Sequence, residues 1–453
     1  MEAATKESRP LFTNQQLWAL IVPLLIEQLL AVAVGMADTM MVSQAGEAAV
    51  SGVSLVDMIN NLIIYLFSAL ATGGAVVTSQ FIGARRIREA GDSAGQLVLL
   101  SLLSGLGILA FCLLCGRPVM RLFFGSITED VMEAGLLYLR ITAVSYPFLA
   151  LYNAGAALFR SVGNSGISMR VSIVMNIINI VGNAIGVLVL HLGVAGVALP
   201  TLISRAVAAF LILRAAEHGA GPVQLHLRGL RLRGHMVRRI LEIGVPSAVE
   251  NGLFQLGRLL VVSIIATFGT AQIAANAVAN NLDGMAILGG QALGLATITV
   301  VGQCVGAGDY AQARRYNRKL MLISWLLIAA SAAVILTSLP LLLNLYNISD
   351  EARVLSAQLV RLHNIPAIAL WCLSFTLPNT LRAAGDARFT MVVSIVSMAV
   401  FRIGFSVVLG IWMGMGAIGV WIAMDIDWVC RVICFVARYF SGAWTRKYQN
   451  YQA

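Results

Sequence analysis

Charged residues make up only 11% of this 453-residue sequence, and just three of them are lysine. Lys6, Lys319 and Lys447 lie outside the predicted membrane spans, which excludes a catalytic lysine inside those segments. The sequence has no Gly-Lys dipeptide, so it holds no Walker A phosphate loop, and it lacks the H-E-x-x-H zinc-protease signature. We therefore expect neither enzymatic activity nor a cofactor.

Cysteine is scarce as well, and every cysteine falls inside or at the end of an apolar segment. The six are Cys112, Cys115, Cys304, Cys372, Cys430 and Cys434. A thiol in such a setting packs as a small hydrophobe. The C-x-x-C spacing of Cys112 and Cys115 stands alone, without a second pair or nearby histidines, so a metal or redox site is only weakly indicated.

What the sequence has in abundance is apolar residues. They form 59% of the chain, and the mean hydropathy is +0.84, which soluble domains of this length do not sustain. The net charge of +10 comes from basic residues in short loops between apolar runs. Membrane topology explains that charge, so we expect a polytopic membrane protein in contact with lipids and no nucleic-acid partner.

Apolar runs of about 20 residues, the length that crosses a bilayer as a helix, predict an all-α protein with twelve transmembrane helices. The predicted spans are 17 to 42, 50 to 73, 95 to 115, 131 to 156, 168 to 190, 194 to 215, 240 to 267, 274 to 300, 320 to 343, 354 to 379, 390 to 412 and 416 to 440. The expected organisation is an N-terminal segment (1–16), an N-lobe of helices 1 to 6 (17–216), a linker (217–238), a C-lobe of helices 7 to 12 (239–440) and a C-terminal tail (441–453).

The cations predict the orientation of these helices. Placing both termini and the even-numbered loops on one side collects 22 of the 31 Lys and Arg residues there, whereas the other side holds Arg117, Arg121 and Arg353. Positively charged loops remain in the cytoplasm. We therefore expect a multi-pass protein of the cell membrane with cytoplasmic termini.

The two halves repeat. A shift of 223 residues superposes Pro23 on Pro246, Glu27 on Glu250 and Gln80 on Gln303, and a shift of 222 superposes Arg160 on Arg382. Each half holds an even number of spans, so both enter the membrane from the same side. Two pseudo-symmetric six-helix bundles, related by an axis along the membrane normal, are the economical interpretation.

Carboxylates inside membrane spans are costly and mark functional sites by default. Helices 1, 2, 7 and 8 hold five of them against the single cation Arg258. The five are Glu27, Asp38, Asp57, Glu250 and Asp283. An acidic cavity between the bundles would favour cationic substrates and could bind protons or sodium. Alternatively, Asp283 neutralises Arg258, and Asp38 and Asp57 lie shallow enough to be hydrated.

Helix 5 adds three asparagines on one face, Asn176, Asn179 and Asn183. Either their amides complete a cation or proton site with Glu27 and Asp38, or they are interhelical hydrogen-bonding glue. In helix 12, Asp427 and Arg431 have the i, i+4 spacing of an internal ion pair, while Asp425 and Arg402 have no assigned role.

Twelve spans in two repeated halves resemble the multidrug and toxic compound extrusion (MATE) family. The sequence Val34-Gly35-Met36-Ala37-Asp38-Thr39 ends helix 1, Gly244-Val245-Pro246-Ser247 opens helix 7, and Arg-x-x-Gly-Asn/Asp loops follow helices 4 and 10. The resemblance covers residues 14 to 440. It implies an antiporter that exports organic cations in exchange for protons or sodium by alternating access.

By position, the resemblance also implies roles for individual residues. Asp38 matches the family's helix 1 aspartate, and Glu27, Asn179, Asn183 and Thr201 match its N-lobe cation site, where sodium is a candidate ligand. Glu250 matches the helix 7 acid of the NorM branch, and Pro23 sits where helix 1 bends in the DinF-like branch.

Two departures from the family pattern bear on these roles. Position 183 is Asn where DinF-like members usually carry Asp, and helix 10 has no acid between Glu351 and Asp386. Both favour the N-lobe as the place of ion coupling and leave Asp57, Glu250, Arg258 and Asp283 as lining of a substrate cavity.

The leading hypothesis is therefore a multidrug efflux antiporter that works as a monomer. A flippase of lipid-linked saccharides shares this bundle architecture, but five acids against Arg258 argue against its anionic substrates. A non-transporting receptor is the remaining alternative, and the internal repeat argues against it.

Overall fold

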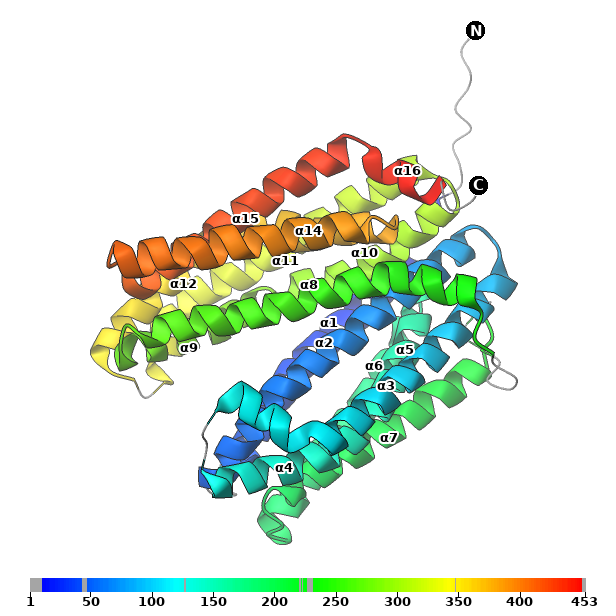
Figure 1. Ribbon diagram of the computed structural model, residues 1–453. Helices are drawn as coiled ribbons and strands as arrows, with labels where there is room; N and C mark the ends of the chain where they lie inside the picture. The colour runs from blue at the N-terminus through cyan, green and yellow to red at the C-terminus, as the bar shows by residue number, and fades with distance from the viewer. Residues whose placement is uncertain are drawn as a thin grey trace.

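The computed structural model describes residues 10–42, 47–125, 128–219, 221, 223–225, 231–346 and 348–449. Residues 1–9 and 450–453 of the predicted terminal segments, and seven of the 22 residues of the predicted linker, lie outside this part of the chain. All regular elements of the described residues longer than a single bridge are helices (Figure 1).

The first bundle contains seven α-helices. They are α1 (Asn14–Val42), α2 (Glu47–Gly83), α3 (Ile87–Phe124), α4 (Glu129–Val144), α5 (Tyr146–Ser161), α6 (Ser165–Ala184), which continues as the π-helical η2 (Ile185–Val189), and α7 (Ala195–Glu217).

The second bundle follows the same plan. Its helices are α8 (Gly234–Ala266), α9 (Thr270–Ala286), α10 (Leu288–Gly306), α11 (Tyr310–Asn344), α12 (Asp350–Trp371) with η3 (Cys372–Thr376) and α13 (Leu377–Ala383), α14 (Ala387–Ser397) with η4 (Met398–Gly404) and η5 (Ser406–Trp412), α15 (Gly416–Phe440) and the short α16 (Ala443–Gln449).

Among the described residues, ten helical segments are long and apolar enough to cross a membrane, and the bent pair α4 and α5 makes an eleventh. The helix α15 completes the twelve spans of the fold. Its 25 residues would also cross a bilayer, but its middle carries Asp425, Asp427 and Arg431 and is therefore less apolar. Two pseudo-symmetric bundles of six spans each are confirmed.

Two of the predicted spans are not single helices. The fourth span breaks at Ser145 with a 45° bend, because Pro147 enters the first turn of α5 and lacks a backbone N–H. The eighth span breaks at Ile287 between α9 and α10. By contrast, α1 runs without interruption through the buried Pro23.

The two lobes lie against each other near the chain termini and diverge toward the opposite end (Figure 1). Their contact has pseudo-two-fold character: α2 of the N-lobe packs on α8, and α1 packs on α10 of the C-lobe, while α2 and α10 contact each other across the axis. Outward-facing surfaces carry exposed large apolar residues such as Leu114 and Phe440, as a lipid-facing perimeter requires.

At the end near the termini, α2 and α10 meet main chain to main chain. A Cβ placed on Gly83 would lie 1.9 Å from the carbonyl oxygen of Gln303, and one on Gly306 would lie 1.9 Å from that of Gln80. Only glycine permits this approach. We call these four residues the glycine crossing.

The glutamine side chains of the glycine crossing are exchanged between the lobes. Gln80 Nε2 donates to the carbonyl of Ala383 in the C-lobe (2.8 Å), and Gln303 Nε2 donates to the carbonyl of Ser161 in the N-lobe (2.7 Å). Both carbonyls belong to the last residue of a helix, where no intrahelical donor is available. Each lobe thereby caps a helix of the other.

Replacing Gly83 by alanine should destabilise the contact between the lobes. The added methyl group meets a carbonyl oxygen of the other lobe, and such overpacking costs about 1–3 kcal/mol. We expect a lower thermal unfolding temperature of the purified protein in detergent and faster modification of a cysteine placed at Gln303.

Gly107→Ala is the matched control, because Gly107 lies in the α3 helix with nothing within 4 Å of a Cβ at that place. Alanine there should stabilise the protein by about 0.5–1 kcal/mol through higher helix propensity. Equal unfolding temperatures for the two variants would contradict the interpretation of the glycine crossing.

Candidate functional site

A chain of hydrogen bonds joins four of the predicted residues in the N-lobe. Asn183 Nδ2 donates to Asp38 Oδ1 at 2.8 Å and lies 3.3 Å from Asn179 Oδ1, and Asn179 Nδ2 donates to Thr201 Oγ1 at 3.1 Å. Helices α1, α6 and α7 supply these side chains. Asn183 is fully buried, and its Oδ1 has no hydrogen-bond partner among the described residues.

Oxygen atoms of this kind suit a proton or a sodium ion. The carboxylate of Asp38, the free amide oxygen of Asn183 and the hydroxyl of Thr201 are hard ligands of the type that alkali and alkaline-earth cations prefer. Within the described residues, no three His, Cys, Asp or Glu side chains are grouped as a site for a metal such as zinc.

Glu27 lies apart from this chain. It precedes Asp38 by eleven residues in the same helix, which is a rise of about 16 Å. Its Oε1 accepts a hydrogen bond from Ser168 Oγ of α6 at 2.6 Å. The structure therefore divides the predicted N-lobe residues into two groups along the contact of α1 with α6.

Asp57 of α2 belongs to another polar cluster within the N-lobe. It accepts hydrogen bonds from Asn60 Nδ2 (3.0 Å) and Tyr138 OH (3.2 Å), and Tyr146 OH donates to Asn60 Oδ1 (2.6 Å). Arg205 of α7 is the cation that interacts with both Asp57 and Asp38. Sequence reasoning passed over Arg205, although it is charged and lies inside a predicted span.

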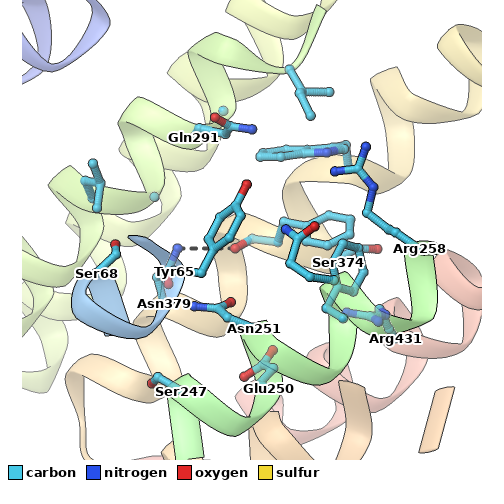
Figure 2. Close-up of a pocket in the computed structure, with 18 of the residues that line it drawn as sticks. Tyr65, Ser68, Ser247, Glu250, Asn251, Arg258, Gln291, Ser374, Asn379 and Arg431 are labelled. Carbon is cyan, nitrogen blue, oxygen red and sulfur yellow. Dashed lines mark hydrogen bonds between the residues drawn. The ribbon is translucent and has the colours of Figure 1, made fainter. Parts of the chain in front are cut away.

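A cavity of about 450 Å³ lies between the lobes. Figure 2 shows polar side chains that converge on it from α2, α8, α10 and the helices of span 10. The N-lobe contributes Gln28, Tyr65, Ser68 and Thr72, and the C-lobe supplies the larger share of the lining. The volume is ordinary for a small-molecule site.

Three of the four predicted cavity residues line this space: Glu250, Arg258 and Asp283. Asp57 is not part of its lining. Aromatic rings form much of the C-lobe wall, where Trp371 stacks on Phe375 with centroids 5.2 Å apart. Trp371 and Phe375 had no role in the sequence prediction.

The expected excess of acid in the cavity is not found. Arg382, Arg402 and Arg431 from spans 10 to 12 line it together with Arg258, so four guanidinium groups stand against two carboxylates. The expectation was based on spans 1, 2, 7 and 8. Of the four cations, those spans hold only Arg258. Most of the added positive charge is compensated by carboxylates close to the wall.

Glu250 is held by Arg382 rather than by Arg258. Arg382 Nη2 donates to its Oε1 at 2.7 Å, Ser394 Oγ donates to the same oxygen at 2.6 Å, and Thr390 Oγ1 lies 3.4 Å from Oε2. Both members of the ion pair are largely buried. Glu250 is therefore a fixed, neutralised part of the cavity wall.

The repeat gives Glu27 an equivalent set of neighbours. Arg160 and Ser168 of the N-lobe correspond to Arg382 and Thr390 of the C-lobe. Ser168 keeps its hydrogen bond to Glu27. In the described part of the chain, however, Arg160 forms no ion pair with Glu27, so the N-lobe glutamate lacks the clamp of its C-lobe counterpart.

The predicted pair in span 12 is confirmed. Arg431 Nε donates to Asp427 Oδ1 at 3.0 Å, and Arg402 Nη1 lies 4.0 Å from Asp427 Oδ2. Arg402 and Asp425 now have neighbours as well, since Asp425 accepts a hydrogen bond from His363. The basic residue nearest to Asp283 in the described part of the chain is His363, whose Nε2 lies 3.8 Å from Asp283 Oδ2, and Arg258 forms no ion pair with Asp283 there.

Removing one member of the Glu250–Arg382 pair should be worse than removing both charges. Arg382→Met leaves a buried, uncompensated carboxylate, which costs about 3–5 kcal/mol. The double variant Glu250→Gln, Arg382→Met should recover most of that loss. Unfolding temperatures of the purified variants measure the difference, and an additive double variant would contradict a direct pair.

The comparisons with known proteins agree with this architecture. The MatE family model matches residues 23–185 and again 246–408, two copies that begin 223 residues apart. A Bacillus subtilis protein described as the uncharacterized transporter YisQ is 30% identical over 98% of both chains. The probable multidrug resistance protein NorM of Thermotoga maritima is 23% identical over 96% of this chain and 94% of its own.

A solved structure described as the outward-facing conformation of a multidrug resistance MATE family transporter has the same fold. Its TM-score is 0.89 at 22% identity, covering 95% of this chain and 96% of that one. Two family matches at the spacing of the internal repeat, on two bundles of six membrane spans, leave one conclusion: this chain is a membrane transporter of the MATE family.

Proposed function

We propose that this transporter is a secondary active efflux antiporter that exports organic cations in exchange for protons or sodium. The observation that carries the proposal is the hydrogen-bonded chain from Asp38 through Asn183 and Asn179 to Thr201. It offers an ion-binding site in the N-lobe, separate from the cavity that accommodates the substrate.

The substrate site is the cavity between the lobes. Its aromatic wall suits planar and cationic groups, which are attracted by ring faces. Asp283 has a buried oxygen without a partner among the described residues, and it is the carboxylate of this wall best placed to receive an amine. The names of several relatives refer to multidrug resistance, and amphipathic drug molecules fit this lining.

Coupling proceeds through α1. An ion bound at Asp38 alters the contact of α1 with α6, and Glu27 lies on the same helix closer to the chain termini. Pro23 removes one backbone hydrogen bond of α1 next to Glu27, which makes this segment the natural hinge. The two lobes, 17–216 and 239–440, move about the linker 217–238 as the two bodies of alternating access.

The termini lie in the cytoplasm of the cell, because the loops on their side of the membrane carry the excess of arginine. The lobes diverge on the other side (Figure 1), which is the exterior side in this orientation. One chain contains both the ion site and the cavity, and it works as a monomer.

Asp38→Asn and Glu27→Gln should each abolish export driven by an ion gradient. Losing the charged partner of a hydrogen bond costs about 1.5–3 kcal/mol, which is tenfold or more in ion affinity. The measurement is efflux of ethidium from proteoliposomes with a proton gradient or a sodium gradient imposed separately. Whichever gradient drives the wild type identifies the coupling ion.

Asp350→Asn is the matched control, since Asp350 is an exposed residue at the start of α12 that pairs only with Arg353 among the described residues. It should export ethidium as the wild type does. Undiminished gradient-driven efflux by both the Asp38 and the Glu27 variants would remove the N-lobe site from the coupling mechanism.

The orientation has its own test. A short epitope inserted after His191, in the loop between η2 and α7, should bind antibody added to intact spheroplasts. The same epitope after Ala453 should bind only once the membrane is permeabilised. The opposite pattern would place the termini outside and reverse the direction of the proposed transport.

The arginines of the cavity favour a second candidate, export of lipid-linked saccharides or other anionic amphiphiles. Arg258 forms no ion pair within the described residues and lines the cavity. Parallel efflux assays with ethidium and with the anion taurocholate decide between the two substrate classes. Faster export of taurocholate, lost in Arg258→Gln, would favour the second.

A further inference from the structure

A histidine in the C-lobe lies between two carboxylates that come from two other helices. His363 of α12 is fully buried, and its Nδ1 lies 2.6 Å from Asp425 Oδ1 of α15. Its other ring nitrogen, Nε2, lies 3.8 Å from Asp283 Oδ2 of α9. The three helices pack against one another, so the cluster joins spans 8, 10 and 12.

The two ring nitrogens are in different situations. Because Asp425 accepts a hydrogen bond, it selects the tautomer whose proton is on Nδ1. Nε2 then carries a lone pair directed toward Asp283, and it has no hydrogen-bond partner among the described residues. Asp283 Oδ1 is likewise buried without a partner. A proton on Nε2 would give the ring nitrogen a donor role toward the carboxylate of Asp283.

The ring is held rigidly. Trp421 contacts the imidazole edge-to-face with centroids 4.9 Å apart, and Trp428 lies at 4.3 Å on another side. These indoles keep water from the ring, so the exchange route for a proton at Nε2 runs through Asp283. That side chain is 14% exposed and lines the cavity between the lobes.

The other charged groups around the cluster are few. Arg402 of η4 and Arg258 of α8 interact with Asp283, and Asp427 lies two residues beyond Asp425 in α15. Arg361 is exposed and points away from His363, two residues along α12. The packed stretches of α10 and of α11 beyond Lys319 hold no ionisable side chain except Cys304.

We propose that His363 is a second proton-binding site of the transporter, and that a cationic group of the substrate exchanges with its proton at Asp283. This inference rests on the proposed export of cations. In the proton-loaded state, Nε2–H pairs with Asp283 and Nδ1–H pairs with Asp425. When a cation approaches Asp283, the proton on Nε2 passes by way of that carboxylate to water in the cavity, and His363 returns to the neutral tautomer.

Charge decides the exchange. Asp425 stays paired with Nδ1 in both states, so the imidazolium and the substrate cation would compete for Asp283, with which Arg402 and Arg258 also interact. Like charges in a poorly solvated wall repel one another. Only one of them remains. A histidine that served packing alone would have both nitrogens satisfied, as buried polar groups normally are.

The test uses the purified full-length protein in detergent and the probe tetraphenylphosphonium, which has a permanent charge and no titratable group. Its binding to the wild type should release protons into weakly buffered solution. The dissociation constant should also rise on acidification, by up to about tenfold per pH unit for each proton displaced. His363→Asn should lose one proton of this release and the corresponding part of the pH dependence.

Repeating the measurement in the Asp38→Asn background separates the two lobes. Proton release that remains there should vanish when His363→Asn is added. His191→Asn is the matched control: His191 is an exposed residue at a positive φ of 49°, which asparagine accepts, and its replacement should leave binding and proton release unchanged.

Unchanged proton release and an unchanged pH profile in His363→Asn would overturn the proposal. If that variant does not fold, His363→Gln answers the same question, because it removes the titratable ring and leaves Asp283 and Asp425 in place, and it should lose the same proton of the release. Failure of the proposed function itself would be seen differently, as a wild type that binds the probe but does not export it from proteoliposomes under any gradient.

Discussion

The glycine crossing is the constraint on which the rest of the structure depends. Gly83 and Gly306 allow α2 and α10 to approach within backbone contact, and the glutamines beside them are exchanged between the lobes. Because the lobes meet at this point near the chain termini, they are free to separate at the other end. The position of the cavity, between α1 and α2 on one side and the C-lobe on the other, follows from that geometry.

The duplicated framework carries different chemistry in its two halves. Glu27 and Glu250 occupy equivalent positions, but only Glu250 is clamped by its arginine. Glu250 is already neutralised and contributes shape to the cavity wall, whereas Glu27 forms no ion pair within the described residues and accepts a hydrogen bond from Ser168. Asp38 has no acidic counterpart in the C-lobe, where Val261 takes its place. The C-lobe instead holds His363 and two aspartates.

Much of the fold could be predicted from the sequence, because span length, loop charge and the internal repeat can all be recognised in the sequence alone. The contacts of individual side chains were harder to predict. The separation of Glu27 from Asp38 could have been predicted from the rise of a helix alone. The partner of Glu250 could not, since Arg382 lies 132 residues away in a different span.

The same limit applies to the breaks and to the charge of the cavity. Pro147 predicts the bend at Ser145, but no proline indicates the end of α9 at Ile287. Arg382, Arg402 and Arg431 reach the cavity only because spans 10 to 12 turn one face toward it, and that rotation is a result of packing rather than of any local pattern.

The glycine crossing has one more consequence. Its contacts are made by carbonyl oxygens, glycine Cα atoms, primary amides and the guanidinium of Arg239, which donates to Gln80 Oε1 at 2.9 Å, and none of these gains or loses a proton in the biological range. The contact between the lobes on this side of the membrane is therefore indifferent to acidity. In the proposed mechanism, an ion gradient therefore acts at a distance from the glycine crossing, and the long helices α1 and α8 transmit the movement to it.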